Sequence, residues 1–207
     1  GNASKRSPMP GFHGFGCGCR AEDDFIGVAT ELLLPWIDVD GVVGLNEDVD
    51  NSAKGVFRPY DQRLDDTKLV ETPEGDAELL IKVPFASPVK LTAITVIGGD
   101  RGRAPARVEL YGNREELDFT SVADVQAEQE LDLGEDFHGA IQYPLRAGRF
   151  SNVTHLCLHF PNSINGEQTR IHWIGLWGTG SSHKRQAVVT VYEAIPNASE
   201  KATRDDV

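Results

Sequence analysis

The sequence predicts an all-β fold of the sandwich or jelly-roll type. About eight short apolar segments, several of them alternating apolar and polar residues at period two, follow one another at intervals of roughly 8 to 20 residues. Glycine, proline and asparagine punctuate the connections, and no long stretch has the 3.6-residue period of a helix. Two packed layers of strands are therefore expected. The expected strands cover residues 79–85, 89–97, 107–111, 130–133, 139–145, 153–160, 170–178 and 187–192.

The segment from Leu79 to Phe85 is the most regular of these strands, with every second residue apolar and Lys82 on the other face. Pro84 lacks the amide donor of a ladder, so this strand is expected to end there or to lie on an edge. The next segment, residues 89–97, is β-branched and almost wholly apolar, which indicates burial on both faces. Residues 25–45 predict a short helical turn and a covering segment, and residues 122–130 have weak helical character.

The chain of 207 residues is long enough for one domain with a substantial core. Residues 1–24 are rich in glycine and poor in apolar periodicity, which predicts a flexible arm. Residues 25–196 are the expected folded domain. Residues 197–207 lack apolar content and are expected to be a disordered tail.

The net charge of −12 argues against nucleic acid as the main partner, because affinity for phosphate backbones depends on lysine and arginine. A basic or mixed protein partner fits this charge better, although solubility alone also explains it. Three cysteines cannot form a fully paired disulfide framework, so a reducing compartment is expected. No window has the roughly 18 to 20 apolar residues of a membrane span. The first thirty residues lack the apolar stretch of a secretory signal, so no such signal is expected.

The expected arm contains two candidate chemical sites. Gly1, followed by Lys5 and a second basic residue, resembles an N-myristoylation start, whose strict pattern has serine or threonine where Lys5 stands. Membrane anchoring is expected only if Gly1 is acylated; a plain tail or a cloning remnant is the alternative. His13, Cys17 and Cys19 are candidate metal ligands, but they are three ligands only, and C-x-C is not the C-x-x-C knuckle of a closed zinc site.

Three further patterns have a structural and a functional interpretation. His155, Cys157 and His159 share one face of the strand at 153–160, where a metal site competes with side chains packed against a loop or second sheet. Trp173 and Trp177 share a face of the strand at 170–178 and either line a sugar site or belong to the core. A third pattern, an acidic pair before a glycine, lacks the offsets of a calcium loop and is expected to form a solvated turn; it comprises Asp38 and Asp40.

The catalytic motifs of hydrolases, metalloproteases, nucleotide-binding enzymes and C-x-x-C oxidoreductases are absent from the sequence. The carboxylates are numerous but scattered over expected loops, so no acid and base pair follows from their spacing. We therefore expect no catalytic residue and no cofactor.

Five ordered motifs resemble the PITH domain family. They are Asp76–Phe85, Val89–Leu91, Glu109–Asn113 with Leu117–Phe119, Arg149–Leu156, and Ile174–Gly178. Upstream, Ile37-Asp38 and Leu45–Glu47 match the opening of that family, and Gly55–Pro59 resembles the form found in its stand-alone members. The similarity covers about residues 25–196 and is specific through the order of the motifs.

This resemblance implies a galactose-binding-like β-sandwich, in agreement with the strand pattern. The family is named for its interaction with the proteasome through a thioredoxin-like protein, but this chain has neither room for a thioredoxin domain nor an active-site cysteine pair. Its stand-alone members are linked to the proteasome and to transcription of a differentiation regulator. They also have a His/Gly-rich start with C-x-C, similar to His13, Cys17 and Cys19, whereas the position of Cys157 is not regularly cysteine.

The expected function is that of a non-enzymatic adaptor that associates with the proteasome regulatory particle, in the cytoplasm and nucleus. A module that binds sugar or lipid is one alternative, because galactose-binding-like sandwiches often hold such ligands at their loop ends. A structural subunit of a larger stable assembly is another.

Overall fold

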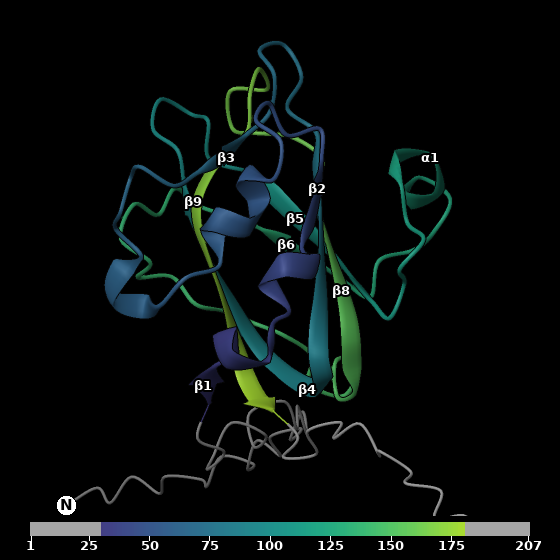
Figure 1. The fold of residues 1–207 in the computed structure, drawn as a ribbon. Helices are drawn as coiled ribbons and strands as arrows, with labels where there is room; N and C mark the ends of the chain where they lie inside the picture. The colour runs from purple at the N-terminus through teal and green to yellow at the C-terminus, as the bar shows by residue number, and fades with distance from the viewer. Residues whose placement is uncertain (1–29, 181–207) are drawn as a thin grey trace, which may run out of the picture.

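The computed structural model describes residues 30–180, in which strands and short helical turns are connected by long loops (Figure 1). The expected arm and tail, and the expected strand at 187–192, lie outside these residues. The strands are β1 (Glu31–Leu32), β2 (Val43–Leu45), β3 (Val70–Glu71), β4 (Leu79–Gly98), β5 (Arg107–Gly112), β6 (Gln129–Asp132), β7 (Tyr143–Pro144), β8 (Val153–Phe160) and β9 (Arg170–Gly180). The helical elements are η2 (Leu34–Trp36), η3 (Val39–Gly41), η4 (Ser52–Val56), η5 (Tyr60–Gln62) and α1 (Phe119–Val122).

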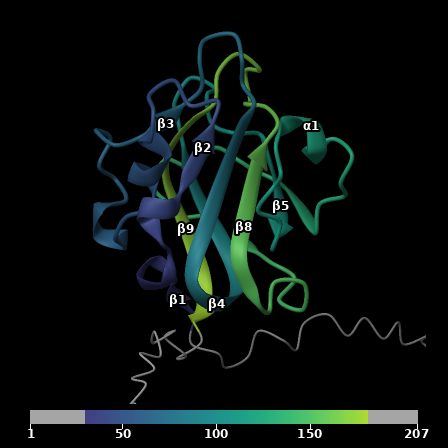
Figure 2. The ribbon, with the colours of Figure 1, turned by 45° about the vertical axis from the view of Figure 1, so that its right-hand side comes forward.

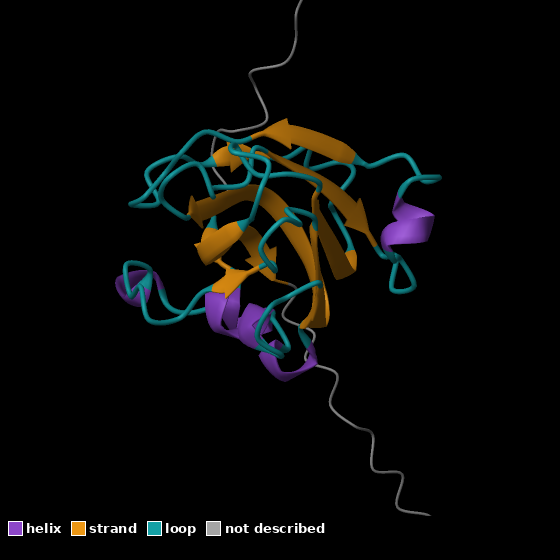
Figure 3. Ribbon diagram, turned by 90° about the horizontal axis from the view of Figure 1, so that it is seen from above, coloured by secondary structure: helices purple, strands orange, loops and turns teal. Residues whose placement is uncertain are grey.

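All strand pairs are antiparallel, in the order β1-β9-β4-β8-β5-β6. β2 and β7 also pair with β4, and β3 pairs with β9. Seen from above, the sheet curls round so that its two halves face each other across the core (Figure 3). The prediction of a β-sandwich is confirmed.

β4 is one strand of 20 residues that passes from one layer to the other. Its first part, Leu79–Pro84, pairs with β8, and its second part, Val89–Gly98, pairs with β9. Figure 2 shows β4 running down one layer, bending at the bottom and returning in the other. The prediction that the strand ends at Pro84 or lies on an edge was wrong, because β4 continues past Pro84 and its first part has β2 on one side and β8 on the other. Pro84 and Pro88 lie at the register shift, where a residue without an amide donor is tolerated.

β9 contains a bulge at His172. Ile97 of β4 lies opposite Trp173, whereas the next residue, Gly98, lies opposite Ile171, so His172 is the additional residue on β9. The bulge changes the phase of the side chains: Ile171 and Ile174 both belong to the core between the layers. Trp173 therefore points to the outer face of β9.

The main core fills the space between the two layers, with Leu79, Ile81, Val83 and Phe85 on the inner face of β4 as predicted. Every residue of β4 from Leu91 to Ile97 is buried, which confirms the prediction of burial on both faces. The outer face of the first half of β4 and of β8 has a smaller apolar cluster, covered by the segment between β5 and β6.

The connections were predicted less well than the strands. The helical turn expected near the start is η2, with Pro35 in its first turn. The helix α1 precedes the stretch where helical character was expected, and a capping box between Asp118 and Ser121 starts it. The strand expected at 139–145 is reduced to β7, and β1, β2 and β3 were not anticipated.

Candidate functional site

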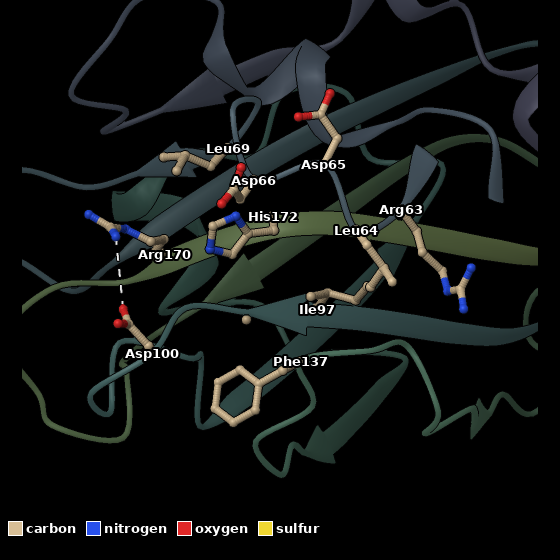
Figure 4. A pocket seen from close by; sticks show the side chains of 11 residues that line it. Arg63, Leu64, Asp65, Asp66, Leu69, Ile97, Asp100, Phe137, Arg170 and His172 are labelled. Carbon is tan, nitrogen blue, oxygen red and sulfur yellow. Dashed lines mark ion pairs between the residues drawn. The ribbon is translucent and has the colours of Figure 1, made fainter. Parts of the chain in front are cut away.

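A hollow of about 350 Å³ lies beside the bulge of β9 (Figure 4). Three parts of the chain form it: the segment after η5, the loop after β6, and the adjacent ends of β4 and β9. Its lining residues are Arg63, Leu64, Asp65, Asp66, Leu69, Ile97, Gly98, Asp100, Phe137, Arg170 and His172.

The first loop of the hollow, residues 55–68, is organised by the buried guanidinium of Arg58, which is 5% exposed. Arg58 donates hydrogen bonds to six backbone carbonyl oxygens, five of them within this loop and the sixth that of His172 at 2.7 Å. Its own carbonyl accepts from Nε1 of Trp173 at 2.9 Å. Burial lowers the pKa of Arg58, and the nearby carboxylate of Asp65 opposes this shift. The loop is thus fastened to the bulge itself.

The second loop of the hollow follows β6 and is organised by the buried carboxylate of Asp136, which is 6% exposed. Asp136 accepts hydrogen bonds from the amides of His138, Gly139 and Ile141 at 2.7–3.0 Å. Burial by itself raises the pKa of Asp136, but these bonds from backbone amides outweigh it and hold the pKa below its usual value. The carboxylate is therefore charged at neutral pH, and it fixes the loop that carries Phe137.

Large apolar side chains on both loops face solvent. Leu64 is 53% exposed, Phe137 44%, Tyr60 44% and Ile141 38%. Arg63 joins the two loops, because its Nε donates to the carbonyl oxygen of His138 at 3.0 Å while its guanidinium stacks 4.0 Å from the centre of the Tyr60 ring. We call these four apolar residues the apolar rim. Such a group of exposed apolar side chains among charged residues is typical of a surface that contacts another molecule.

The charged groups of the hollow differ in what they already bind. Arg170 forms an ion pair with Glu71 and lies 3.9 Å from Asp100. Asp65 accepts from the amide and hydroxyl of Thr67, and these bonds lower its pKa. Asp66 is exposed and, among residues 30–180, has no lysine or arginine nitrogen within 4.0 Å. Its carboxylate lies beside the His172 ring (Figure 4).

His172 lies at the base of the hollow, and burial followed by repulsion from Arg170 and Arg58 lowers its pKa. The ring is therefore neutral at physiological pH. Its Nδ1 is buried and has no hydrogen-bond partner in the described part of the chain.

Comparison with known proteins identifies the family. The family model for the PITH domain matches residues 24–196. The chain belongs to the PITH domain family. "PITH domain-containing protein 1" of Xenopus laevis is 36% identical over 191 residues, which cover 91% of this chain and 90% of that protein. The Homo sapiens protein of the same name is 34% identical and covers 90% of each chain.

Solved structures similar to this PITH domain are galactose-binding-like modules. The CBM32-1 and CBM32-2 domains of Clostridium perfringens ZmpB, in complex with GalNAc, align with a TM-score of 0.54 at 11% identity, over 73% of this chain and 36% of theirs. A fucolectin from striped bass serum aligns with a TM-score of 0.50 at 9% identity, over 74% of this chain and 50% of its own. These similarities establish the fold and nothing about ligands.

The three candidate metal ligands on β8 of the PITH domain have separate partners. Nδ1 of His155 lies 2.8 Å from Oε1 of Glu115. His159 is buried between two carboxylates, with Nε2 2.8 Å from Oε1 of Glu78 and Nδ1 3.0 Å from Oε2 of Glu109. Cys157 is packed in the smaller apolar cluster, and burial raises the pKa of its thiol to about 12. Within residues 30–180, no group of three His, Cys, Asp or Glu side chains is placed to hold a metal ion.

Trp173 and Trp177 share the outer face of β9, as predicted, and both pack edge-on against Tyr60 with ring centres 5.9 Å apart. Trp173 is fully buried beneath Tyr60 of η5, so of the two interpretations the core one is confirmed for this residue. The indole nitrogen of Trp177 donates to Oγ1 of Thr95 at 3.1 Å. Asp38 caps η3 by accepting from the amide of Gly41, as expected for a turn.

The candidates Gly1, His13, Cys17 and Cys19 lie outside the described residues. Within the described residues, no helix is long and apolar enough to cross a membrane.

The residues of the hollow were not found by sequence reasoning. Two signals were available. Arg58 stands in the motif Gly55–Pro59, which was noted only as a mark of the family, and Leu64 and Phe137 are isolated large apolar residues in acidic connections. Neither signal indicates that the two loops, about 70 residues apart, meet at one place.

Proposed function

We propose that this PITH domain protein is a non-enzymatic adaptor that associates with the proteasome regulatory particle in the cytoplasm and nucleus. In this proposal the adaptor also has a regulatory role linked to transcription. The proposal draws its partner from the resemblance to stand-alone PITH proteins. Its physical support is the apolar rim: Tyr60, Leu64, Phe137 and Ile141 expose apolar area on loops whose backbone is held in place.

The rim is suited to binding a protein because it is already ordered. Arg58 and Asp136 satisfy the backbone of the two loops internally, and Arg63 connects them. A surface that is fixed before contact loses less conformational entropy on binding than a mobile loop does. Aromatic and aliphatic side chains at its centre are the type that contributes most to association.

Affinity purification of the tagged full chain from a gentle extract, followed by mass spectrometry, tests the proposal. The native chain is expected to enrich subunits of the regulatory particle. The double variant Leu64→Asp/Phe137→Asp is expected to lose them, because two carboxylates would be desolvated in the interface. Ile164→Asp is the matched control, since Ile164 is 47% exposed and lies outside the hollow. Absence of regulatory-particle subunits with the native chain would refute the proposed partner.

A further inference from the structure

We propose that the hollow beside the β9 bulge binds an extended segment of a partner protein in which an apolar side chain stands next to a lysine or arginine. This inference rests on the proposed adaptor function and names the chemistry of the partner at the same surface.

The walls of the hollow select the apolar side chain. Leu64, Leu69, Ile97 and Phe137 all line it, and they come from three separate parts of the chain. In the close view, Leu64 and Ile97 lie to one side of the His172 ring and Phe137 lies below it (Figure 4). A volume of about 350 Å³ is at the lower end for ligand sites and accommodates one large side chain with its neighbouring backbone. Filling it would remove apolar area of both partners from water, at roughly 25 cal/mol per Å².

The charges of the hollow select the basic neighbour. Its cations already have partners: Arg170 pairs with Glu71, and Arg63 binds a carbonyl oxygen and the Tyr60 ring. Asp66 is different, because it is exposed and has no cationic partner within residues 30–180. An incoming ammonium or guanidinium group would pair with this carboxylate, and the net charge of −12 would favour its approach.

The His172 ring at the base of the hollow does not repel an incoming positive charge. Because burial keeps the His172 ring neutral, it adds no positive charge beside Asp66. The bulge fixes its position, since the His172 carbonyl oxygen accepts from Arg58 at 2.7 Å. The carboxylate and the apolar walls are thus presented together on a rigid base.

The test uses the full chain labelled with ¹⁵N and a library of acetylated hexapeptides. Each peptide has one leucine or phenylalanine flanked by lysine, arginine, glutamine or glutamate. Titration followed by amide chemical shifts is expected to show binding of the peptides with basic flanks, with the largest shifts at residues 64–66, 137 and 172. Asp66→Asn is expected to weaken that binding about threefold to tenfold. Asp66→Lys is expected to shift the preference to glutamate flanks.

Asp124→Asn is the matched control, because Asp124 is also exposed but follows α1 on the far side of the fold (Figure 1). Equal binding of basic, neutral and acidic peptides would overturn the charge selection. Absence of shifts at the hollow with every peptide would overturn the docking site. The proposed function is tested separately, by enrichment of the regulatory particle with the native chain. If that enrichment is seen and the peptides do not bind, this inference fails while the proposed function stands.

Discussion

The two loops that frame the hollow are each organised by one buried charge, but the charges have opposite sign and different connections. Arg58 binds six carbonyl oxygens and reaches across to the bulge of β9. Asp136 binds three amides of its own loop with its carboxylate, and its backbone carbonyl accepts from the Gly98 amide at 3.2 Å. A further bond to this loop comes from Arg63, whose Nε donates to the His138 carbonyl oxygen. The first loop is therefore part of the core, whereas the second is a surface loop that holds its own shape.

This difference indicates how one rim can be both stable and adjustable. The Arg58 loop covers Trp173, whose indole donates to the Arg58 carbonyl, so moving this loop would expose a large buried side chain. Moving the Asp136 loop would uncover Ile97, against which Gly139 packs, but Ile97 is a smaller side chain than Trp173, and Phe137 and Ile141 of the loop are already 44% and 38% exposed. Any adjustment to a partner is expected mainly in the Asp136 loop.

The largest effect is expected from Arg58→Ala. It removes the guanidinium donor from six partly buried carbonyl oxygens, and we expect the free energy of unfolding to fall by about 3 to 5 kcal/mol. Urea unfolding measures this loss. Arg58→Lys is the control: an ammonium group keeps the charge but has three donors, so we expect a loss between those of the native chain and the alanine variant. A loss below 1 kcal/mol would show that the loop does not depend on Arg58.

A smaller effect is expected from Asp136→Ala, which removes three hydrogen bonds of one surface loop and should cost about 1 to 3 kcal/mol. Hydrogen exchange should locate the change: the amides of His138, Gly139 and Ile141 lose protection while those of residues 55–68 keep theirs. Equal loss of protection in both loops would show that they form one cooperative unit and would remove the distinction between them.

The two buried charges also differ in their pH dependence. The pKa of Asp136 in the folded chain lies below its usual value of 3.8, so its contribution to stability is complete above that pH and is lost as the pH falls through the folded pKa. Arg58 itself has no such dependence, because a guanidinium remains charged throughout this range. Asp65 in the same loop also has a lowered pKa, so the test compares the native chain with Asp136→Asn, in which Asp65 is unchanged. We expect the difference in stability between the native chain and Asp136→Asn to narrow in acid, as followed by thermal unfolding from pH 7 to pH 2. A constant difference would contradict this assignment.

The strands were predictable because their period and composition are local properties. β8 was expected at its observed bounds, and the inward face of β4 follows from alternation alone. The bend of β4 was not predictable from Pro84, since a proline that ends a strand and one that lies at a bend between two layers have the same local sequence. The hollow depends on the bulge at His172 and on contact between loops remote in sequence, which periodicity does not report.

The smallest effect on stability is expected from substituting the rim itself, one residue on each loop. Leu64→Ser and Phe137→Ser alter side chains that are already about half exposed, so each should change the free energy of unfolding by no more than about 0.5 kcal/mol. Both should nevertheless weaken capture of the regulatory particle, because binding buries what folding leaves exposed. If the Asp136 loop is the adjustable side, the native residue at 137 should show the larger change in hydrogen exchange on complex formation, whereas the amide of Leu64 should change little. Equal changes at the two positions would mean that the partner meets two equally rigid walls.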